Sequence, residues 1–296
     1  MTHTGTGHTL LVIVETFQTR AGSGSPRART TRGQDDIRAR QDRLADALRV
    51  VYERLSPGQR IVLEYKLFEP SFYTMDVPDW GTSLLHCLAL GPQAAVIVDT
   101  GRHAPGTNIE FIVALLLRAG RLGGFDFNSR FYADDDLMAG AADPFQLFRI
   151  MREVVAADAL TPAAGVTFML DQCHNIEPKI PAQIRSVMNV QEATAKALLV
   201  DSEALAAAQV AGDVLGANAV LMDAYNTDVR PLLEQVRTDL GLDQDRWPPT
   251  PAAVTPRRSS PTASAARPPA GAPRGCFVET PPSQPRESSA IMKAVR

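Results

Sequence analysis

Short apolar segments alternate with amphipathic segments through the middle of the chain, and this alternation narrows the folds that it can adopt. We expect strands at residues 61–68, 94–99, 122–127 and 166–170. We expect a helix after each strand, at residues 80–90, 108–118, 143–156 and 181–200. Strands that alternate with helices form right-handed crossovers and a parallel sheet. The sequence therefore predicts an α/β fold, and its uninterrupted apolar strands indicate a sheet that is covered on both faces.

Residues that cap helices mark several of the predicted helix starts. Asp143 followed by Pro144 is typical of a helix start, and Thr107 with Glu110 has the spacing of a capping box. An acidic pair that ends at Asp36 favours the start of a helix that runs to about residue 55. We also predict helices at residues 203–215 and 218–240, and a further strand within residues 8–17.

The composition divides the chain into three regions. Residues 1–33 form an atypical, poorly ordered segment, because residues 19–33 are rich in Gly, Arg, Ser and Thr. Residues 34–246 carry the regular pattern of strands and helices. Residues 247–296 hold half of the 22 prolines and seven Lys or Arg against two Glu, with little apolar periodicity. Such a segment buries too little apolar surface to offset its conformational entropy, so we predict a disordered tail.

Charge and cysteine content exclude several classes of protein. The 296 residues carry a formal net charge of −3, and the basic tail leaves the rest more acidic, which excludes a typical nucleic-acid-binding protein. The three cysteines lie far apart, which excludes a disulfide framework and a CxxC-type metal site. The longest apolar runs are far shorter than the ~18 residues that cross a bilayer. We therefore expect a cytoplasmic protein that binds neither nucleic acid nor membrane.

A carboxylate lies at or near the carboxyl end of each predicted strand: Glu64, Asp99, Asp126 and Asp171. Ligands of parallel α/β folds bind at this edge of the sheet. A single aspartate at a strand end is more often a helix cap, but four converging carboxylates would repel one another unless a cation lay among them. An all-oxygen site suits Mg²⁺ or Mn²⁺. The sequence therefore predicts a divalent-cation site.

Two neighbouring features fit such a site. Asp134 and Asp136 are alternate residues of an acidic triplet, so they can face the same way and bind a cation, although such a triplet is more often a solvated loop. Lys66 lies two residues after Glu64 on one strand and shares its face. Lys66 therefore either forms a simple ion pair or stabilises negative charge on a substrate oxygen.

Five short motifs that contain these residues give the chain a specific resemblance. They lie at residues 64–70, 99–105, 123–128, 134–137 and 171–175. In their order and spacing the chain resembles bacterial L-rhamnose isomerase, a (β/α)8-barrel enzyme (a TIM barrel) of the xylose isomerase-like superfamily. The resemblance covers residues 34–240, so residues 34–246 are interpreted as a partial sugar-isomerase barrel domain.

The resemblance implies a metal-dependent aldose–ketose isomerisation, in which L-rhamnose becomes L-rhamnulose by a metal-assisted hydride shift. It implies two divalent cations, commonly Mn²⁺, with Mg²⁺, Co²⁺ or Zn²⁺ as substitutes. The implied ligands of the first cation are Glu64, Asp99, Asp126 and Asp171, and those of the second are Asp134, Asp136 and a shared carboxylate. The implied catalytic residues are Lys66 and Asp171, and His174 would support the ligands from behind.

Two positions depart from the pattern of that family. Asp126 stands where L-rhamnose isomerases have a histidine ligand, although xylose isomerases have an aspartate there. Arg102 stands where the family has a histidine ligand of the second cation, and a protonated arginine cannot bind a metal. The adjacent His103 is one residue out of register and should point elsewhere. We hypothesise that Arg102 pairs with Asp134 and Asp136 and partly replaces the second cation, which leaves one cation here.

The resemblance covers only the C-terminal half of the family's barrel, with its C-terminal helices, because about four strands expected before Glu64 are nearly absent. Such a half barrel needs a homo-oligomer, commonly a tetramer in the family, or another partner to cover its sheet edges. Its expected substrate is a small sugar. Two alternatives stay open: a non-catalytic, truncated remnant of such an enzyme, and a xylose isomerase-like enzyme or an epimerase that acts on another sugar.

Overall fold

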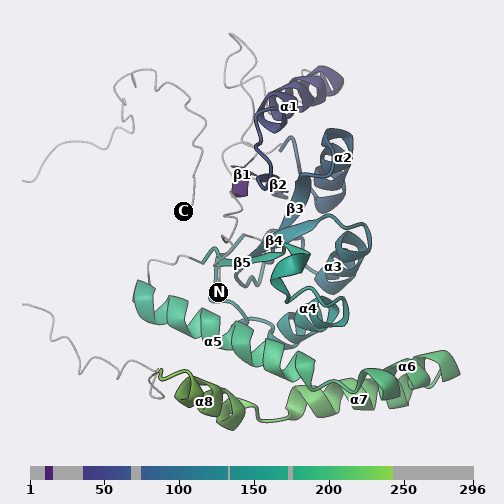
Figure 1. The fold of residues 1–296 in the computed structure, drawn as a ribbon, viewed down its shortest axis with the longest axis vertical. Helices are drawn as coiled ribbons and strands as arrows, with labels where there is room; N and C mark the ends of the chain where they lie inside the picture. The colour runs from purple at the N-terminus through teal and green to yellow at the C-terminus, as the bar shows by residue number, and fades with distance from the viewer. Residues whose placement is uncertain (1–10, 16–35, 68–74, 133, 173–175, 243–296) are drawn as a thin grey trace, which may run out of the picture. The chain divides into compact units, whose positions relative to one another are not determined.

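The computed structural model describes residues 11–15, 36–67, 75–132, 134–172 and 176–242, all of which belong to one compact unit. The predicted tail and most of the predicted N-terminal segment lie outside these residues. The helices and strands, in chain order (Figure 1), are β1 (Leu11–Glu15), α1 (Ile37–Tyr52), β2 (Arg60–Glu64), α2 (Trp80–Leu90), β3 (Ala94–Asp99), α3 (Ile109–Arg118), β4 (Leu122–Phe127), α4 (Pro144–Ala156), a 3₁₀ turn (Pro162–Ala164), β5 (Thr167–Leu170), α5 (Lys179–Leu198), α6 (Ser202–Ala211), α7 (Val214–Asn226) and α8 (Arg230–Asp239).

The five described strands form one parallel sheet in the order β1-β2-β3-β4-β5. Each strand pairs with its neighbour in sequence, from Leu11 beside Arg60 to Phe127 beside Leu170. Because the order never reverses and crossovers share one hand, helices α1 to α4 lie on the same face of the sheet (Figure 1). The predicted α/β class is confirmed, and β1 lies within the segment predicted as a further strand. In the described sheet β1 and β5 are the edge strands, so closure into a (β/α)8 barrel stays a prediction.

The sheet buries two different faces, because successive side chains point to opposite sides of a strand. Leu63 and Val96 are fully buried among the apolar side chains of the helices. A separate apolar cluster on the opposite face contains Val62, Ala95 and Ile97. The same alternation places the carboxylates that end β2 and β3 on this second face, and so the fold itself directs charged side chains to one place.

Side chains of the residues before the helices cap several of them. The predicted start at Asp143 is confirmed, because its carboxylate accepts a hydrogen bond from the Gln146 amide at 2.9 Å. The predicted capping box at Thr107 is wrong. Asn108 is the capping residue, and its side-chain oxygen accepts a hydrogen bond from the Phe111 amide at 2.8 Å. Asparagine caps at least as well as threonine, and here it lies one residue closer to the helix.

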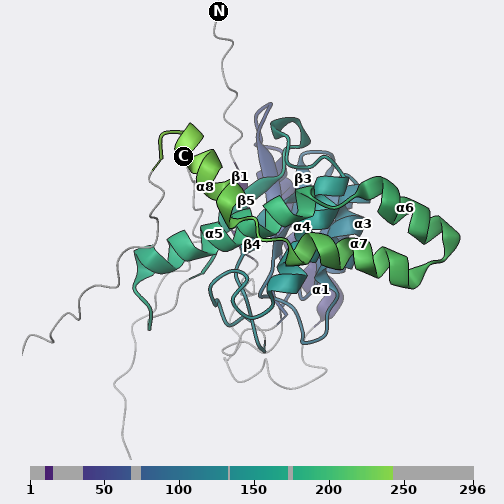
Figure 2. The same ribbon diagram turned by 90° about the horizontal axis from the view of Figure 1, so that it is seen from below.

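The C-terminal helices follow one another without strands, and their limits differ from the predicted ones. Gly212, in a left-handed conformation, ends α6, and α7 begins two residues later. The helix predicted for residues 218–240 is divided into α7 and α8, with Pro231 in the first turn of α8, where the missing N–H of proline costs nothing. Figure 2 shows α6 and α7 as a hairpin that projects beyond the sheet. Tyr225 of α7 packs edge-on against Phe145 of α4, with ring centroids 4.9 Å apart.

The longest of the described helices is α5, with 20 residues, and it carries lysine, arginine and glutamate along its length. Among the residues that the structure describes, no helix is both long enough and apolar enough to cross a membrane. The cytoplasmic location stays a prediction.

Candidate active site

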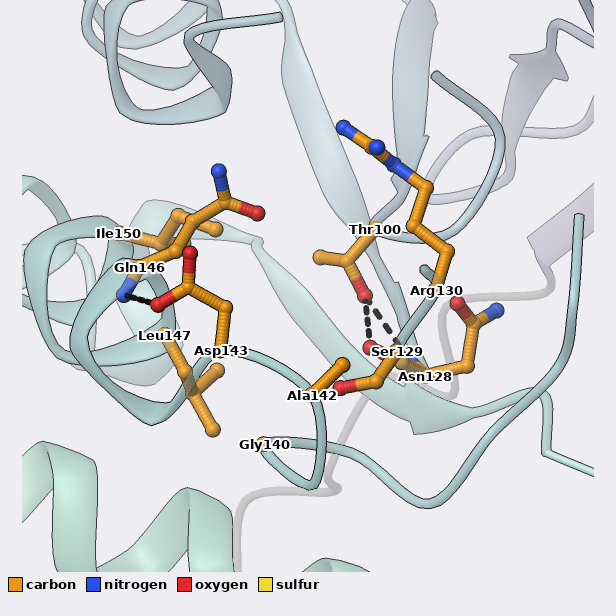
Figure 3. Close-up of a pocket in the computed structure, with 10 residues that line it drawn as sticks. All are labelled: Thr100, Asn128, Ser129, Arg130, Gly140, Ala142, Asp143, Gln146, Leu147 and Ile150. Atoms are coloured by element: carbon orange, nitrogen blue, oxygen red, sulfur yellow. Dashed lines mark hydrogen bonds between the residues drawn. The ribbon is translucent and has the colours of Figure 1, made fainter. Parts of the chain in front are cut away.

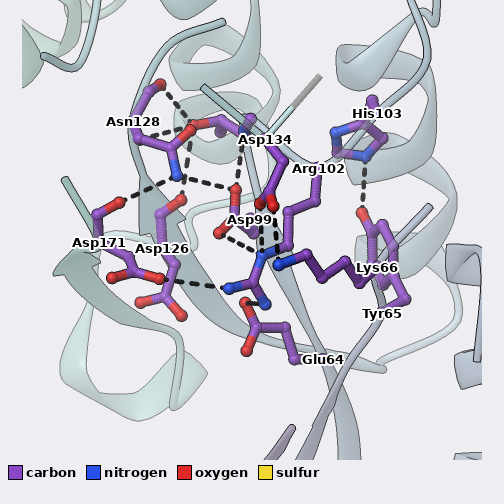
Figure 4. Close-up of polar contacts among 12 residues, drawn as sticks. Glu64, Tyr65, Lys66, Asp99, Arg102, His103, Asp126, Asn128, Asp134 and Asp171 are labelled. Carbon is purple, nitrogen blue, oxygen red and sulfur yellow. Dashed lines mark hydrogen bonds and ion pairs between the residues drawn. The ribbon is translucent and has the colours of Figure 1, made fainter. Parts of the chain in front are cut away.

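Four carboxylates gather at the carboxyl edge of the sheet (Figure 4). Glu64 ends β2, Asp99 ends β3, Asp126 lies in β4 and Asp171 directly follows β5. The strand register sets Asp99 beside Asp126. Three of the four are buried, whereas the side chain of Asp171 is 47% exposed. Asp171 is therefore the member of this group that a molecule arriving from solvent can reach.

Three of these carboxylates are close enough to share one cation. One oxygen each of Glu64, Asp126 and Asp171 lies within 4.8 Å of the other two. Oxygens that bind one Mg²⁺ at about 2.1 Å lie at most about 4.2 Å apart, and larger ions allow more. The three side chains thus need only a small inward shift to hold a divalent cation, and a set made only of oxygens is the kind that Mg²⁺ and Mn²⁺ prefer.

Asp99 is held by protein groups. Its Oδ1 accepts hydrogen bonds from the Gly101 amide at 2.8 Å and from Asn128 Nδ2 at 2.9 Å, and its Oδ2 lies 3.3 Å from Arg102 Nε. A Cβ at position 101 would lie 2.1 Å from Asn128 Oδ1, so only glycine permits this approach. Burial raises the pKa of Asp99 to about 6, although Arg102 opposes the shift. The three-oxygen group does not include Asp99, and its role as a metal ligand stays a prediction.

The guanidinium of Arg102 lies in the middle of the acidic side chains (Figure 4). It forms ion pairs with Glu64 and Asp99, with Asp134 (Nε to Oδ1, 3.3 Å) and with Asp171 (Nη2 to Oδ2, 3.6 Å). Burial opposes its charge, but the four carboxylates outweigh burial and raise the pKa of Arg102. The pairing with Asp134 that the sequence predicts is therefore present, as one contact among four.

The acidic loop after β4 forms an ion pair with a second basic side chain of the site, Lys66, and contains Asp136, a second carboxyl group with a raised pKa. The Asp134 amide donates a hydrogen bond to the Gly101 carbonyl at 2.9 Å, and Asp134 Oδ2 lies 2.7 Å from Lys66 Nζ. Lys66 thus lies in the same site as Glu64, paired with the loop. Burial and, after it, the neighbouring aspartates raise the pKa of Asp136 to about 6. Among the described contacts no ion pair joins Asp136 to Arg102, which corrects that half of the predicted pairing.

A buried tyrosine–histidine pair beside the charged residues is a feature that the sequence analysis missed (Figure 4). Tyr65 Oη and His103 Nε2 are 2.7 Å apart. Burial, followed by the nearby Arg130, lowers the pKa of His103 to about 3, so this histidine stays neutral at physiological pH. His103 faces Tyr65, as its position out of register predicts. Thirty-eight positions separate the two residues, and no local pattern in the sequence joins them.

A hollow beside the site lies between the ends of β3 and β4 and the start of α4 (Figure 3). Its lining includes Thr100, Asn128, Arg130 and Asp143. Thr100 Oγ1 donates a hydrogen bond to the Asn128 carbonyl at 2.7 Å, and the Asp143 carboxylate already caps α4. Because this cap occupies the positive end of the helix, we assign no ligand to the hollow.

Parts of two predicted motifs lie outside the described residues. They are residues 68–70 of the first motif and residues 173–175, which include His174. The supporting role of His174 stays a prediction.

Fold and site together define a parallel α/β protein with an acidic site at the carboxyl edge of its sheet. No family model matches the chain. Over 179 residues it is 47% identical to a probable sugar isomerase of Rhizobium meliloti (strain 1021), a match that covers 60% of this chain and 41% of that protein. Over 180 residues it is 46% identical to a probable sugar isomerase of Mesorhizobium japonicum, covering 60% and 42%. The chain thus spans about two fifths of the length of the curated relatives it matches.

Proposed function

We propose that this chain is a metal-dependent sugar isomerase that interconverts an aldose and a ketose, with L-rhamnose and L-rhamnulose as its pair. The observation that carries the proposal is the group of Glu64, Asp126 and Asp171 oxygens within 4.8 Å of one another at the carboxyl edge of the sheet. The names of the two relatives, both probable sugar isomerases, support the class of reaction. The five motifs that resemble L-rhamnose isomerase support the choice of sugar.

Three carboxylates are a set that Mg²⁺ and Mn²⁺ prefer. The resemblance to L-rhamnose isomerase supports Mn²⁺ as the cation, with Mg²⁺, Co²⁺ or Zn²⁺ as substitutes. When bound, the cation would supply Lewis-acid polarisation of the sugar oxygens and a template for the open-chain sugar. Burial of Glu64 and Asp126 keeps their carboxylates in fixed positions. Asp171, which is half exposed, is assigned to the side from which the sugar arrives and to a hydrogen bond with a sugar hydroxyl.

Isomerisation of an aldose moves one hydride and one proton within the sugar. The hydrogen on C2 passes to C1 with its electron pair, and the proton of the C2 hydroxyl passes to the C1 oxygen, so no external oxidant or reductant is consumed. Lys66 is assigned to stabilise the negative charge that develops on the sugar oxygen during this exchange. Its ion pair with Asp134, at 2.7 Å, holds the ammonium in the site before the sugar binds.

Ketose formation is the direct test of this function. The purified full chain, incubated with Mn²⁺ and L-rhamnose, is expected to form L-rhamnulose, and chelator-treated protein is expected to form none. Lys66→Met should lower kcat by about 10²–10³-fold, the range for loss of one charge-stabilising group, with Mn²⁺ affinity little changed. A chain that binds Mn²⁺ but forms no ketose from any aldose would contradict the proposal.

Cation binding can be tested separately from turnover. Asp126→Asn should weaken Mn²⁺ binding by more than about 100-fold, because it removes a charged ligand from a set of three. Asp201→Asn is the matched control, since Asp201 is exposed, caps α6 and can be replaced by asparagine as a cap. Equal Mn²⁺ affinity in the two variants, measured by isothermal titration calorimetry, would exclude Asp126 as a ligand.

One observation favours a second candidate function, a non-catalytic protein that retains the acidic site. Arg102 already pairs with four carboxylates, including Glu64 and Asp171 of the three-oxygen group. Mn²⁺ binding without conversion of L-rhamnose, D-xylose or other aldoses would support this candidate. A ketose from a different aldose, or an epimer of the substrate, would keep the enzyme class and change the sugar.

A further inference from the structure

Arg102 reaches carboxylates from four separate parts of the chain (Figure 4). From the turn after β3 its guanidinium contacts Glu64 at the end of β2 and Asp171 after β5. Its Nε lies 3.3 Å from Asp99 Oδ2 and 3.3 Å from Asp134 Oδ1. The side chain is only 10% exposed. A planar guanidinium has five N–H donors in a fixed fork, which lets it bridge several carboxylates at once.

Two of these carboxylates, Asp99 and Asp134, have contacts to protein groups at both oxygens. Both oxygens of Asp134 are paired with cations, Oδ1 with Arg102 and Oδ2 with Lys66. Asp99 Oδ1 accepts hydrogen bonds from the Gly101 amide and from the Asn128 side chain. Asp99 Oδ2 is buried without a hydrogen bond to any described residue and lies 3.3 Å from Arg102 Nε as an ion pair. These contacts anchor the guanidinium, whose charge is permanent because arginine keeps its proton in proteins.

The remaining carboxylates are arranged differently. Arg102 pairs with one oxygen of Glu64 and with one oxygen of Asp171, and the three-oxygen group that these two residues form with Asp126 lies on the same edge. A second divalent cation beside Asp134 would have to share its place with the guanidinium. Two cations repel strongly in a buried site, where the effective dielectric constant is far below that of water.

We propose that Arg102 is a cation built into the site, which takes the place of a divalent cation between Asp99 and Asp134 and limits the chain to one divalent cation, bound by Glu64, Asp126 and Asp171. The inference rests on the proposed function only for the presence of a divalent cation. Asp99 is then a positioning residue, which fixes Arg102 and does not bind the ion. Arg102 also weakens the affinity of the remaining site, because it adds a positive charge next to it.

The metal stoichiometry of the full chain tests this inference. Chelator-stripped protein is titrated with Mn²⁺ by calorimetry, and bound Mn²⁺ is counted by mass spectrometry of the element after free metal is removed. The unaltered chain should bind one Mn²⁺. Arg102→Lys keeps the charge and should also bind one, whereas Arg102→His offers a metal ligand in place of a fixed cation and should bind two. Arg149→Gln, which removes an arginine paired with Glu110, is the matched control and should bind one.

Several results would overturn the inference: two Mn²⁺ on the unaltered chain, none on it, two on Arg102→Lys, or one on Arg102→His. Asp99→Asn supplies a test of the positioning role. Asp99→Asn should leave the Kd for Mn²⁺ within about threefold of the value for the unaltered chain, because Asp99 is not a ligand in this arrangement. A loss of Mn²⁺ affinity as large as that caused by Asp126→Asn would show that Asp99 is a ligand.

Effects on folding and on catalysis can be distinguished from the effect on metal stoichiometry. Circular dichroism of the stripped proteins shows which variants are folded, and if Arg102→His is unfolded without metal, it is refolded with Mn²⁺ and counted in the same way. The stoichiometry of Arg102→Lys tests the inference even if Arg102→His does not fold. A chain that binds one Mn²⁺ and forms no ketose would contradict the proposed function and support this inference. A chain that binds two and forms ketose would do the reverse.

Discussion

Leu63 and Glu64 are neighbours on β2 and are both buried, yet the protein stabilises them in different ways. Leu63 faces the helices and is surrounded by apolar side chains of α2 and the adjoining strands. Glu64 faces the opposite side, where it meets the guanidinium of Arg102. One residue along a strand therefore separates an apolar core from a buried charged site.

The two regions depend on their contacts to different degrees. In the helix-facing core each side chain contributes in proportion to the surface and volume that it fills, and no single partner is essential. At the carboxyl edge the buried carboxylates depend on a few named partners, Arg102 above all. Removal of one partner there leaves a buried charge uncompensated, which costs more than the contact itself contributes.

Arg102→Gln should have the largest effect on stability. We expect the metal-free variant to lose about 3–5 kcal/mol of unfolding free energy, because carboxylates on several strands lose their shared counter-charge. Urea unfolding in the presence of chelator measures the loss, and added Mn²⁺ should restore part of it by binding the folded state. Arg49→Gln should cost less than about 1 kcal/mol, since both Arg49 and its ion-pair partner Asp46 are exposed. Equal unfolding midpoints for the two variants would contradict the view that the buried carboxylates depend on Arg102.

Leu63→Ala should come next, at about 3 kcal/mol, because it removes buried methyl groups and leaves a cavity in the core. In contrast to Arg102→Gln, this loss should be the same with and without Mn²⁺. Leu85→Ala is the control, because Leu85 is 69% exposed on α2 and should cost less than about 1 kcal/mol. If added Mn²⁺ reduced the loss of unfolding free energy caused by Leu63→Ala, the core and the site would be energetically coupled.

The pH dependence of the unfolding free energy should also distinguish the acidic site from the apolar core. The pKa values of Asp99 and Asp136 are raised to about 6 in the folded protein, above the ordinary value of 3.8, so the folded state binds protons more readily. Their contribution to stability is complete below about pH 4 and is lost as the pH rises through about 6. The unfolding free energy of metal-free Asp136→Asn should therefore fall less between pH 4 and 7 than that of the unaltered chain. Parallel pH profiles would contradict the partly buried position of Asp136 among other carboxylates.

Asn108→Ala should have the smallest effect, about 1 kcal/mol, because it removes one capping hydrogen bond at the start of α3 and changes neither region directly. Asn108→Asp keeps a capping oxygen and should be close to the unaltered chain. Thermal unfolding monitored by circular dichroism is sufficient to distinguish the stabilities of Asn108→Ala and Asn108→Asp. A large loss in both would mean that Asn108 does more than cap the helix.

Most of the fold could be predicted from local patterns. Alternating apolar segments located β2 to β5 within a few residues, and Asp143–Pro144 located the start of α4, because these signals depend on residues that are adjacent in sequence. The strand predicted to run to residue 68 ends at Glu64, although its apolar residues continue. The division between α7 and α8 could have been recognised from Pro231, which disfavours a helix that continues through it.

The site could be predicted only in part, because its chemistry depends on which atom faces which. The strand-end rule was sufficient to bring Glu64, Asp126 and Asp171 together. It could not tell that Asp99 turns its oxygens to Gly101, Asn128 and Arg102, since such contacts are set by three-dimensional packing. For the same reason the sequence indicated one partner of Arg102 correctly and missed three others.

The consecutive order of the strands has a consequence for how the protein forms. Each strand of the described sheet pairs only with strands adjacent to it in the chain, so each pairing requires the closure of one strand–helix–strand connection. Folding rates rise as contacts become more local in sequence. During synthesis, each newly made strand therefore meets a template that is already in place, and the sheet can grow by one strand and one helix at a time behind the ribosome.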